Sequence, residues 1–222
     1  MKNILLLFCL YLLIAATVQK KKKVIFFGDS ITQAAVDKGG YIVRMDSMLE
    51  KKGLKNNYDL VGSGVSSNKV YDLYLRMDED VLSKNPDVVI IFIGVNDVWH
   101  KRSMGTGTDA DKFQKFYNAI LKKLSDKNIK AILCTPAAIG EKTDLSNQLD
   151  GDLNKYSNII RSIAAKNNLP LVDLRKIFLA YNIKNNSENK DRGILTGDGV
   201  HLNAKGNQLV AEEMWNEISK LN

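Results

Sequence analysis

Ser30 stands where a serine nucleophile could act. It lies in the stretch VIFFGDSITQ, in which an apolar run typical of a buried strand continues directly into Gly28-Asp29-Ser30. A hydroxyl at the end of a strand, close to the N–H groups that begin a helix, could attack a carbonyl carbon and have the resulting anion stabilised. Asp and Ser in front of a helix are also ordinary N-caps. The triplet alone therefore leaves both interpretations open.

A serine nucleophile needs a general base, and the chain contains two histidines. Each follows an aspartate by three residues: Asp97 precedes His100, and Asp198 precedes His201. On a turn, this spacing can bring a carboxylate to an imidazole ring, hold the ring's orientation and stabilise the imidazolium that forms. The second pair is favoured because two glycines beside Asp198 predict a tight loop ahead of the last helix.

Two further segments could stabilise an oxyanion. Asn96 ends the most apolar predicted strand, in IGVND, and its side-chain amide is a suitable donor. An Asn-Asp pair is also a common turn. The small-residue segment 61–68, VGSGVSSN, follows the second predicted strand and could contribute backbone N–H groups.

Short apolar runs alternate with amphipathic segments along the chain, which predicts β-α-β units and a parallel sheet covered by helices. The predicted strands are 24–27, 58–61, 88–93, 131–134 and 171–172. The predicted helices are 41–51, 69–83, 110–127, 153–167 and 203–221. Three polar segments, 100–109, 138–151 and 184–197, are predicted as loops. Ligands bind at the carboxyl ends of such strands, which is where the residues above lie.

The composition fits one globular α/β domain. The chain has 222 residues, 45% hydrophobic and 26% charged, with no internal repeat and no linker rich in Pro, Gly or Ser. Its net charge of +7 includes the run 20–23 of four lysines, and the remaining basic residues are dispersed. This pattern argues against nucleic acid as a partner.

Residues 1–18 have the layout of a secretory signal peptide, with an early lysine, an apolar run and small residues at its end. The run is short for a membrane-spanning helix, so no stable membrane anchor is expected. Cys9 lacks the preceding small residues of a lipidated cysteine. We expect cleavage near residue 18, a domain at 19–222, and export to the periplasm or the medium. Cys134 would then be the only cysteine, a small buried side chain in a strand without a disulfide partner.

Taken together, these segments resemble the four blocks of the GDSL/SGNH hydrolases, over about residues 24–220. The resemblance implies a single-domain, flavodoxin-like three-layer fold with a five-stranded parallel sheet and a serine esterase activity without cofactor or metal. It makes Ser30 the nucleophile, His201 the base and Asp198 the residue that orients the base. It makes the Asn96 amide and the backbone N–H groups of Ser30 and Ser67 the oxyanion hole.

The second block departs from the family pattern N-x-G-x-S-G. The chain reads GSGVSS over 62–67, so Ser67 takes the place of a glycine. Serine retains the backbone N–H, but a positive φ would be costly for it. We therefore expect an active enzyme that is slowed at this position.

The substrate is predicted from the three polar loops and from Trp99 at one rim, which together suit a sugar. We expect hydrolysis of short acyl esters, in particular O-acetyl groups on carbohydrates, with Asp29, Gly64, Trp99 and His100 as candidate substrate-binding residues. The alternatives are a lysophospholipase- or thioesterase-like hydrolase of longer acyl esters, and a catalytically weakened glycan-binding module. The aspartates at 144, 150 and 152 form an acidic loop that is more typical of solvated side chains than of a metal site.

Overall fold

The structure is a computed structural model that describes residues 20–221. The predicted signal peptide and its cleavage site lie outside these residues. The strands are β1 (Lys22–Gly28), β2 (Tyr58–Gly64), β3 (Val88–Phe92), β4 (Lys130–Cys134) and β5 (Leu171–Val172). The α-helices are α1 (Ser30–Gln33), α2 (Tyr41–Lys51), α3 (Val70–Asp80), α4 (Val95–Ser103), α5 (Ala110–Asp126), α6 (Asp150–Asn167), α7 (Leu174–Asn185) and α8 (Ala204–Ser219). Short 3₁₀ helices are η1 (Ala34–Val36), η2 (Lys55–Asn57) and η3 (Leu82–Lys84).

The five strands form one parallel sheet in the order β2-β1-β3-β4-β5. The last residue of β1, Gly28, lies beside Gly64 of β2 and Phe92 of β3. The carboxyl ends of these three neighbouring strands are therefore level with one another. Segments that follow the strands emerge along one edge of the sheet, where doubly wound folds place their sites.

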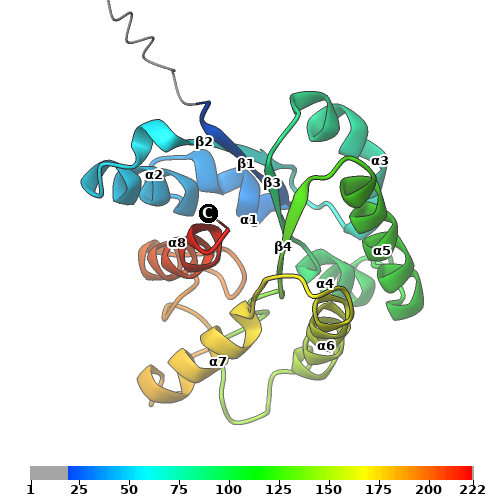
Figure 1. Cartoon of the computed structure of the whole chain (residues 1–222). Coiled ribbons are helices and arrows are strands. Elements are labelled where there is room, and N and C mark those ends of the chain that lie inside the picture. The colour runs from blue at the N-terminus through cyan, green and yellow to red at the C-terminus, as the bar shows by residue number, and fades with distance from the viewer. Residues whose placement is uncertain (1–19, 222) are drawn as a thin grey trace, which may run out of the picture.

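Helices cover both faces of the sheet (Figure 1). On one side α2 packs against α8, and on the other α3 packs against α5 and α5 against α6. The predicted parallel sheet with helices on both faces is confirmed. All five strand positions were predicted, with ends that differ by no more than three residues.

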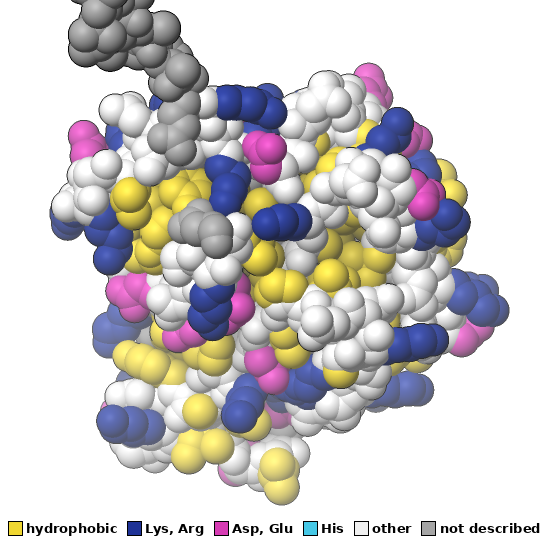
Figure 2. All heavy atoms as spheres, in the orientation of Figure 1, with side chains coloured by type: hydrophobic (Ala, Val, Ile, Leu, Met, Phe, Trp, Pro, Cys, Tyr) yellow, Lys and Arg dark blue, Asp and Glu magenta, His cyan; other side chains and the backbone are white. Residues whose placement is uncertain are grey.

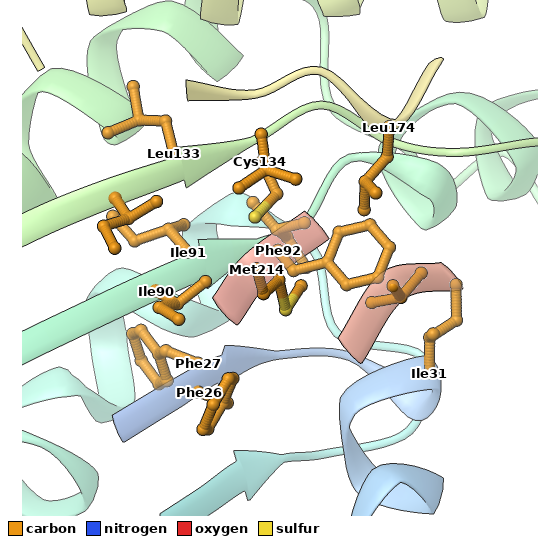
Figure 3. Close-up of a cluster of buried hydrophobic side chains, with 14 of the residues drawn as sticks. Phe26, Phe27, Ile31, Ile90, Ile91, Phe92, Leu133, Cys134, Leu174 and Met214 are labelled. Atoms are coloured by element: carbon orange, nitrogen blue, oxygen red, sulfur yellow. The ribbon is translucent and has the colours of Figure 1, made fainter. Parts of the chain in front are cut away.

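The hydrophobic core lies between the sheet and the two helix layers (Figure 3). Every residue of β3 is buried, and so are the neighbouring apolar residues of β1. Successive strand residues point to opposite faces, so consecutive apolar residues are required where both faces are covered. Cys134 of β4 is fully buried in this cluster, and burial raises the pKa of its thiol.

Two helices differ from the sequence-based prediction. The predicted loop 100–109 is wrong over its first part, because α4 continues through His100 to Ser103. Gly94, with φ +126°, begins this helix, so the Asn-Asp pair behind it lies in a helix and not in a turn. Helix α7 was not predicted: only Asp173 separates it from the two-residue strand β5, and the Asp173 carboxylate accepts a hydrogen bond from the Lys176 N–H to cap the helix.

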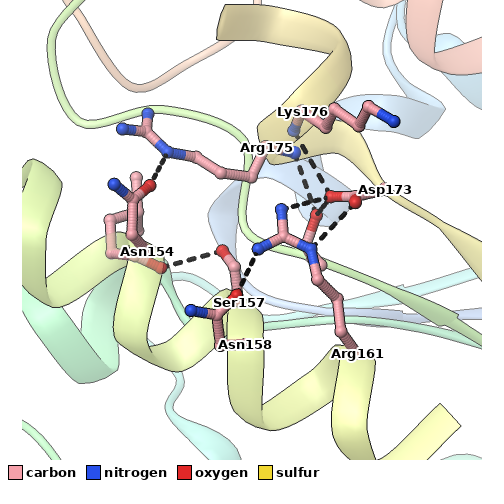
Figure 4. Close-up of polar contacts among 9 residues, drawn as sticks. Asn154, Ser157, Asn158, Arg161, Asp173, Arg175 and Lys176 are labelled. Carbon is pink, nitrogen blue, oxygen red and sulfur yellow. Dashed lines mark hydrogen bonds and ion pairs between the residues drawn. The ribbon is translucent and has the colours of Figure 1, made fainter. Parts of the chain in front are cut away.

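A polar cluster joins α6 to the start of α7 (Figure 4). Both oxygens of Asp173 accept hydrogen bonds from Arg161, at 2.8 and 2.7 Å. Arg175 donates to Asn154 at 2.7 Å and pairs with Asp150 at 2.7 Å. One of the three aspartates of the acidic loop is therefore paired with an arginine.

Charged side chains are dispersed over the face shown in Figure 2, where Lys and Arg alternate with Asp, Glu and apolar side chains. On this face the basic side chains do not form a continuous stripe. Within residues 20–221, no helix combines the length and the apolar character needed to cross a bilayer.

Candidate active site

Ser30 is the first residue of α1, directly after β1. Asp29 is the N-cap: its carboxylate accepts the Ile31 N–H at 3.0 Å, and its carbonyl accepts the Gln33 N–H at 2.9 Å. This one-turn helix begins immediately after the strand end. The half-buried Ser30 hydroxyl is thereby left accessible at the carboxyl edge of the sheet.

The structure brings Ser30 to one of the two histidines. The Ser30 hydroxyl oxygen lies 2.9 Å from His201 Nε2, although 171 residues separate them. On the other side of the ring, His201 Nδ1 lies 2.7 Å from Asp198 Oδ2. Serine, histidine and aspartate thus form a continuous hydrogen-bonded chain of the kind that activates a hydroxyl.

Asp198 is held in place by its own backbone. Its Oδ1 accepts the N–H groups of Val200, at 2.9 Å, and of His201, at 2.7 Å. Partial burial acts to raise the pKa of Asp198, but the hydrogen bonds from the His201 ring and from these N–H groups outweigh it and lower the pKa to about 2. Asp198 is therefore ionised at neutral pH, so it can stabilise a positive charge on the ring.

The segment 65–68 after β2 is tied to the strand end that carries Ser30. Val65 N–H donates to the Gly28 carbonyl at 3.2 Å, and Ser66 N–H donates to the Gln33 side chain at 2.6 Å. Ser67 has φ +64°, the left-handed conformation that favours glycine. Among the hydrogen bonds found within residues 20–221, none uses the Ser67 N–H. Ser67 therefore adopts the backbone geometry expected of the glycine that it replaces.

Asn96 lies in the first turn of α4 and is buried. Its amide nitrogen donates to the Asn68 carbonyl at 3.2 Å, next to Ser67. An amide nitrogen carries two hydrogens, so one bond fixes its orientation and the other hydrogen remains for a ligand. Asn96 and the 65–68 segment thus form one hydrogen-bonded unit.

Arg76 of α3 was not identified from the sequence, yet it connects these segments. Its guanidinium donates to the Gly28 carbonyl at 2.8 Å, to the Ser63 carbonyl at 3.0 Å and to the Asn68 side chain at 2.6 Å. It pairs with Asp80 at 2.6 Å. A helical arginine spaced eight residues from Asn68 gives no sequence signal, because the contact depends on how α3 packs against the strand ends.

The other aspartate–histidine pair does not form a hydrogen bond in the part of the chain that the structure describes. The Asp97 carboxylate instead accepts the Val70 N–H, at 3.2 and 3.3 Å, and so fixes the start of α3. Burial, opposed by hydrogen bonds, raises the pKa of Asp97 to about 7. The buried His100 ring packs beside Trp99, and burial together with the Lys69 charge lowers its pKa.

The candidate substrate-binding residues lie in different surroundings. Asp29 is buried, and burial raises its pKa to about 7. Gly64 faces the backbone of α1: a Cβ there would come within 2.0 Å of the Gln33 nitrogen, so the glycine permits this close approach. Trp99 is half-buried and packs against the core. Asp29 and Gly64 therefore have structural tasks at the strand ends.

A hollow of about 740 Å³ lies at the opposite edge of the sheet, lined by residues at the strand starts such as Lys22, Val88 and Lys130. It brings together lysines, aspartates and apolar side chains, with no nucleophile and base in contact. The chemistry described above lies at the carboxyl edge.

Comparison with known proteins identifies the family of the chain. The family model described as "GDSL-like Lipase/Acylhydrolase family" matches residues 26–209. The crystal structure of the acetyl xylan esterase AlAXEase is 68% identical, with a TM-score of 0.86, over 87% of this chain and 98% of that one. An acetylxylan esterase of Geobacillus stearothermophilus is 29% identical over 88% of this chain and 93% of its own length. An uncharacterised lipoprotein of Bacillus subtilis is 24% identical over 96% of both chains.

The resemblance seen in the sequence is thereby confirmed. The family model covers most of the chain, and it includes both the strand end that carries Ser30 and the loop that carries His201. The chain belongs to the GDSL-like lipase/acylhydrolase family and is a carboxylic ester hydrolase.

Proposed function

We propose that the protein is a serine esterase that removes O-acetyl groups from a carbohydrate, with xylan or its oligosaccharides as the substrate class. The observation that carries the proposal is the chain of contacts from Ser30 through His201 to Asp198, at 2.9 and 2.7 Å. The similarity to acetylxylan esterases, at 68% and 29% identity, supports the acetyl group and the sugar.

The reaction proceeds by acyl transfer in two steps. His201 Nε2 takes the proton of the Ser30 hydroxyl while the oxygen attacks the acetyl carbonyl carbon. The ionised Asp198 accepts a hydrogen bond from the His201 Nδ1–H, which keeps Nε2 free as the proton acceptor and stabilises the imidazolium. As the ester bond breaks, the imidazolium gives its proton to the departing sugar oxygen, which leaves as a hydroxyl; water, activated by the same ring, then releases acetate from Ser30.

The oxyanion is held by the N–H groups of Ser30 and Ser67 and by the second amide hydrogen of Asn96. The unused Ser67 N–H and the oriented Asn96 amide support this assignment. Each donor acts on the charge that develops in the transition state, so it accelerates the chemical step more than it tightens substrate binding.

The test is hydrolysis of p-nitrophenyl acetate and of acetylated xylo-oligosaccharide by residues 19–222. We expect both to be hydrolysed by the wild type. His201→Ala should lower kcat by about 10⁴–10⁶-fold. His100→Ala is the matched control and should leave kcat within a few-fold, because the Ser30 hydroxyl is hydrogen-bonded to His201 and not to His100.

A chain-length series from acetyl to palmitoyl esters separates the proposal from its alternatives. Fastest hydrolysis of acetyl esters supports it, whereas a preference for long chains indicates a lysophospholipase- or thioesterase-like enzyme. Binding of acetylated glycans without turnover, and without labelling of Ser30 by a fluorophosphonate, would indicate the glycan-binding module.

We also propose that the protein is exported, with residues 1–18 removed. The signal-peptide pattern supports this proposal. Intact-mass measurement of the protein recovered from the periplasm or medium tests it: a mass that begins near residue 19 is expected, and a retained Met1 would contradict it.

A further inference from the structure

Glu141 is a buried carboxylate in the loop between β4 and α6, with 1% of its surface exposed. Its Oε1 accepts the N–H groups of Leu195, at 2.6 Å, and Thr196, at 2.8 Å, while Oε2 accepts the N–H of Ile194 at 2.7 Å. Within residues 20–221 no lysine, arginine or histidine forms an ion pair with it. Three backbone donors thus take the place of a counter-ion for this carboxylate.

These donors belong to the segment that leads directly to the Asp198–His201 loop. Thr196 accepts the Gly199 N–H on its side-chain oxygen at 3.1 Å, and Gly197 N–H donates to the His201 carbonyl at 2.8 Å. The residue before Glu141 holds the loop from the other side, because Gly140 N–H donates to the Gly199 carbonyl at 2.8 Å. The 140–141 segment therefore contacts the loop both before and after Asp198.

Glu141 itself is fixed by its backbone. Its N–H donates to the Asp191 carbonyl at 2.9 Å. Its carbonyl accepts the side-chain amide of the buried Asn186 at 2.9 Å, and the same amide donates to the Lys190 carbonyl at 2.7 Å. The backbone of Glu141 is thus bound to residues 186–191 and its carboxylate to residues 194–196, so Glu141 joins two parts of the same loop.

We propose that Glu141 is a positioning residue that holds the Asp198–His201 loop so that His201 Nε2 stays within hydrogen-bond distance of Ser30. This inference rests on the proposed serine esterase function. The loop from 186 to 203 contains no helix and, apart from the Thr196–Leu202 bridge, no strand pairing, so it depends on such bonds for its shape. Charge-assisted hydrogen bonds to backbone N–H groups are stronger than bonds between neutral groups, so the bonds to Glu141 can hold the loop in its shape.

The test is Glu141→Gln, which preserves size and removes the charge. The glutamine oxygen can still accept from Leu195 and Thr196, but its NH₂ group then faces the Ile194 N–H, where two donors oppose each other. Because displacement of a catalytic group by about 1 Å costs about 10²-fold in rate, we expect kcat to fall by about 10²-fold with KM little changed.

A second readout reports on His201 without turnover. The Nδ1 proton that His201 shares with Asp198 should give a strongly deshielded NMR resonance, identified by its absence in His201→Ala. In Glu141→Gln we expect this resonance to weaken or shift. If the wild type gives the resonance but does not hydrolyse acetyl esters, the proposed function fails, while the effect of Glu141 on His201 is still measured.

The matched control is Asp173→Asn, a carboxylate that also accepts several hydrogen bonds but joins α6 to α7 (Figure 4). It should lower the melting temperature and leave both kcat and the resonance unchanged. A folded Glu141→Gln variant with wild-type kcat and resonance would overturn the proposal. If that variant does not fold, Asn186→Ala removes the bonds to the Glu141 and Lys190 carbonyls; a smaller loss of kcat is expected, and an unchanged kcat and resonance would overturn the proposal.

Discussion

The two halves of the candidate active site are built in different ways. The half that carries Ser30, Ser67 and Asn96 consists of short segments that leave β1, β2 and β3, whose ends are aligned by the parallel register. The half that carries Asp198 and His201 is an irregular loop of the chain between α7 and α8.

The strand-end half derives its geometry from the sheet. Backbone hydrogen bonds between strands set the separation of Gly28, Gly64 and Phe92, and Arg76 then links two of the strand ends to Asn68. The loop half has no sheet beneath it and is held by local hydrogen bonds and by Glu141. The sheet register thus sets the position of the strand end before Ser30, whereas hydrogen bonds to side chains hold the loop that carries His201.

The largest expected effect is on the loop half. Asp198→Asn should lower kcat by about 10⁴-fold at neutral pH, because an amide group can donate to Nδ1 and so favour the wrong imidazole tautomer. Hydrolysis of p-nitrophenyl acetate measures this loss. A decrease of less than about tenfold would show that the orientation of His201 does not depend on Asp198.

A single substitution in the strand-end half should lower kcat less than Asp198→Asn does. Asn96→Ala should lower kcat by about 10²–10³-fold with little change in KM, because the oxyanion exists only in the transition state. Saturation kinetics on an acetyl ester separate the two constants. If KM rose and kcat were unchanged, Asn96 would bind the substrate and would not stabilise the oxyanion.

The two halves should also respond oppositely to pH. In the strand-end half, burial raises the pKa of Asp97 from 3.8 to about 7, so its contribution to stability is complete below about pH 4 and is lost as the pH rises through 7. Asp198 has a lowered pKa of about 2, so its contribution is complete above about pH 4 and is lost as the pH falls through 2.

Asp97→Asn tests the first of these contributions. Between about pH 4 and 7, the wild type should lose stability relative to the variant by up to about 1.4 kcal/mol per pH unit. Urea unfolding of both proteins at several pH values measures the difference. Parallel pH profiles for wild type and variant would show that Asp97 does not titrate in this range.

Arg76→Lys tests whether the strand ends need the hydrogen bonds of Arg76, in addition to strand pairing, to keep their positions. Lysine cannot donate to the Gly28, Ser63 and Asn68 oxygens in the same planar arrangement, so we expect a loss of about 2 kcal/mol in stability and about tenfold in kcat. Thermal unfolding and esterase assays measure the two effects. Arg161→Lys is the control: it weakens the hydrogen bonds between α6 and Asp173, so it should lower stability without lowering kcat.

The smallest effect is expected at Ser67. Because a left-handed conformation costs a non-glycine residue about 1 kcal/mol, Ser67→Gly should stabilise the protein by up to about that amount. It should raise kcat a few-fold if serine slows the reaction at this position. An unchanged or lowered kcat would show that Ser67 does not slow catalysis.

Several features followed from the sequence alone. Consecutive apolar residues, as in β1 and β3, are typical of strands whose sheet is covered on both faces, and this pattern predicted the parallel architecture. The order of a strand, Ser30 and a helix also placed the serine at the carboxyl edge. Local sequence was sufficient here because strand segments and helix caps depend on residues that are near one another in the chain.

The tertiary structure decided the features that join distant parts of the chain. The resemblance to the GDSL/SGNH hydrolases favoured His201 over His100 as the base. The contact between Ser30 and His201, across 171 residues, agrees with that choice. Neither Arg76 nor Glu141 was predicted from the sequence, because their hydrogen-bond partners lie on other segments. For Glu141 these partners are 53 to 55 residues away. A hydrogen bond between distant residues forms only after packing has brought the segments together, so no local pattern records it.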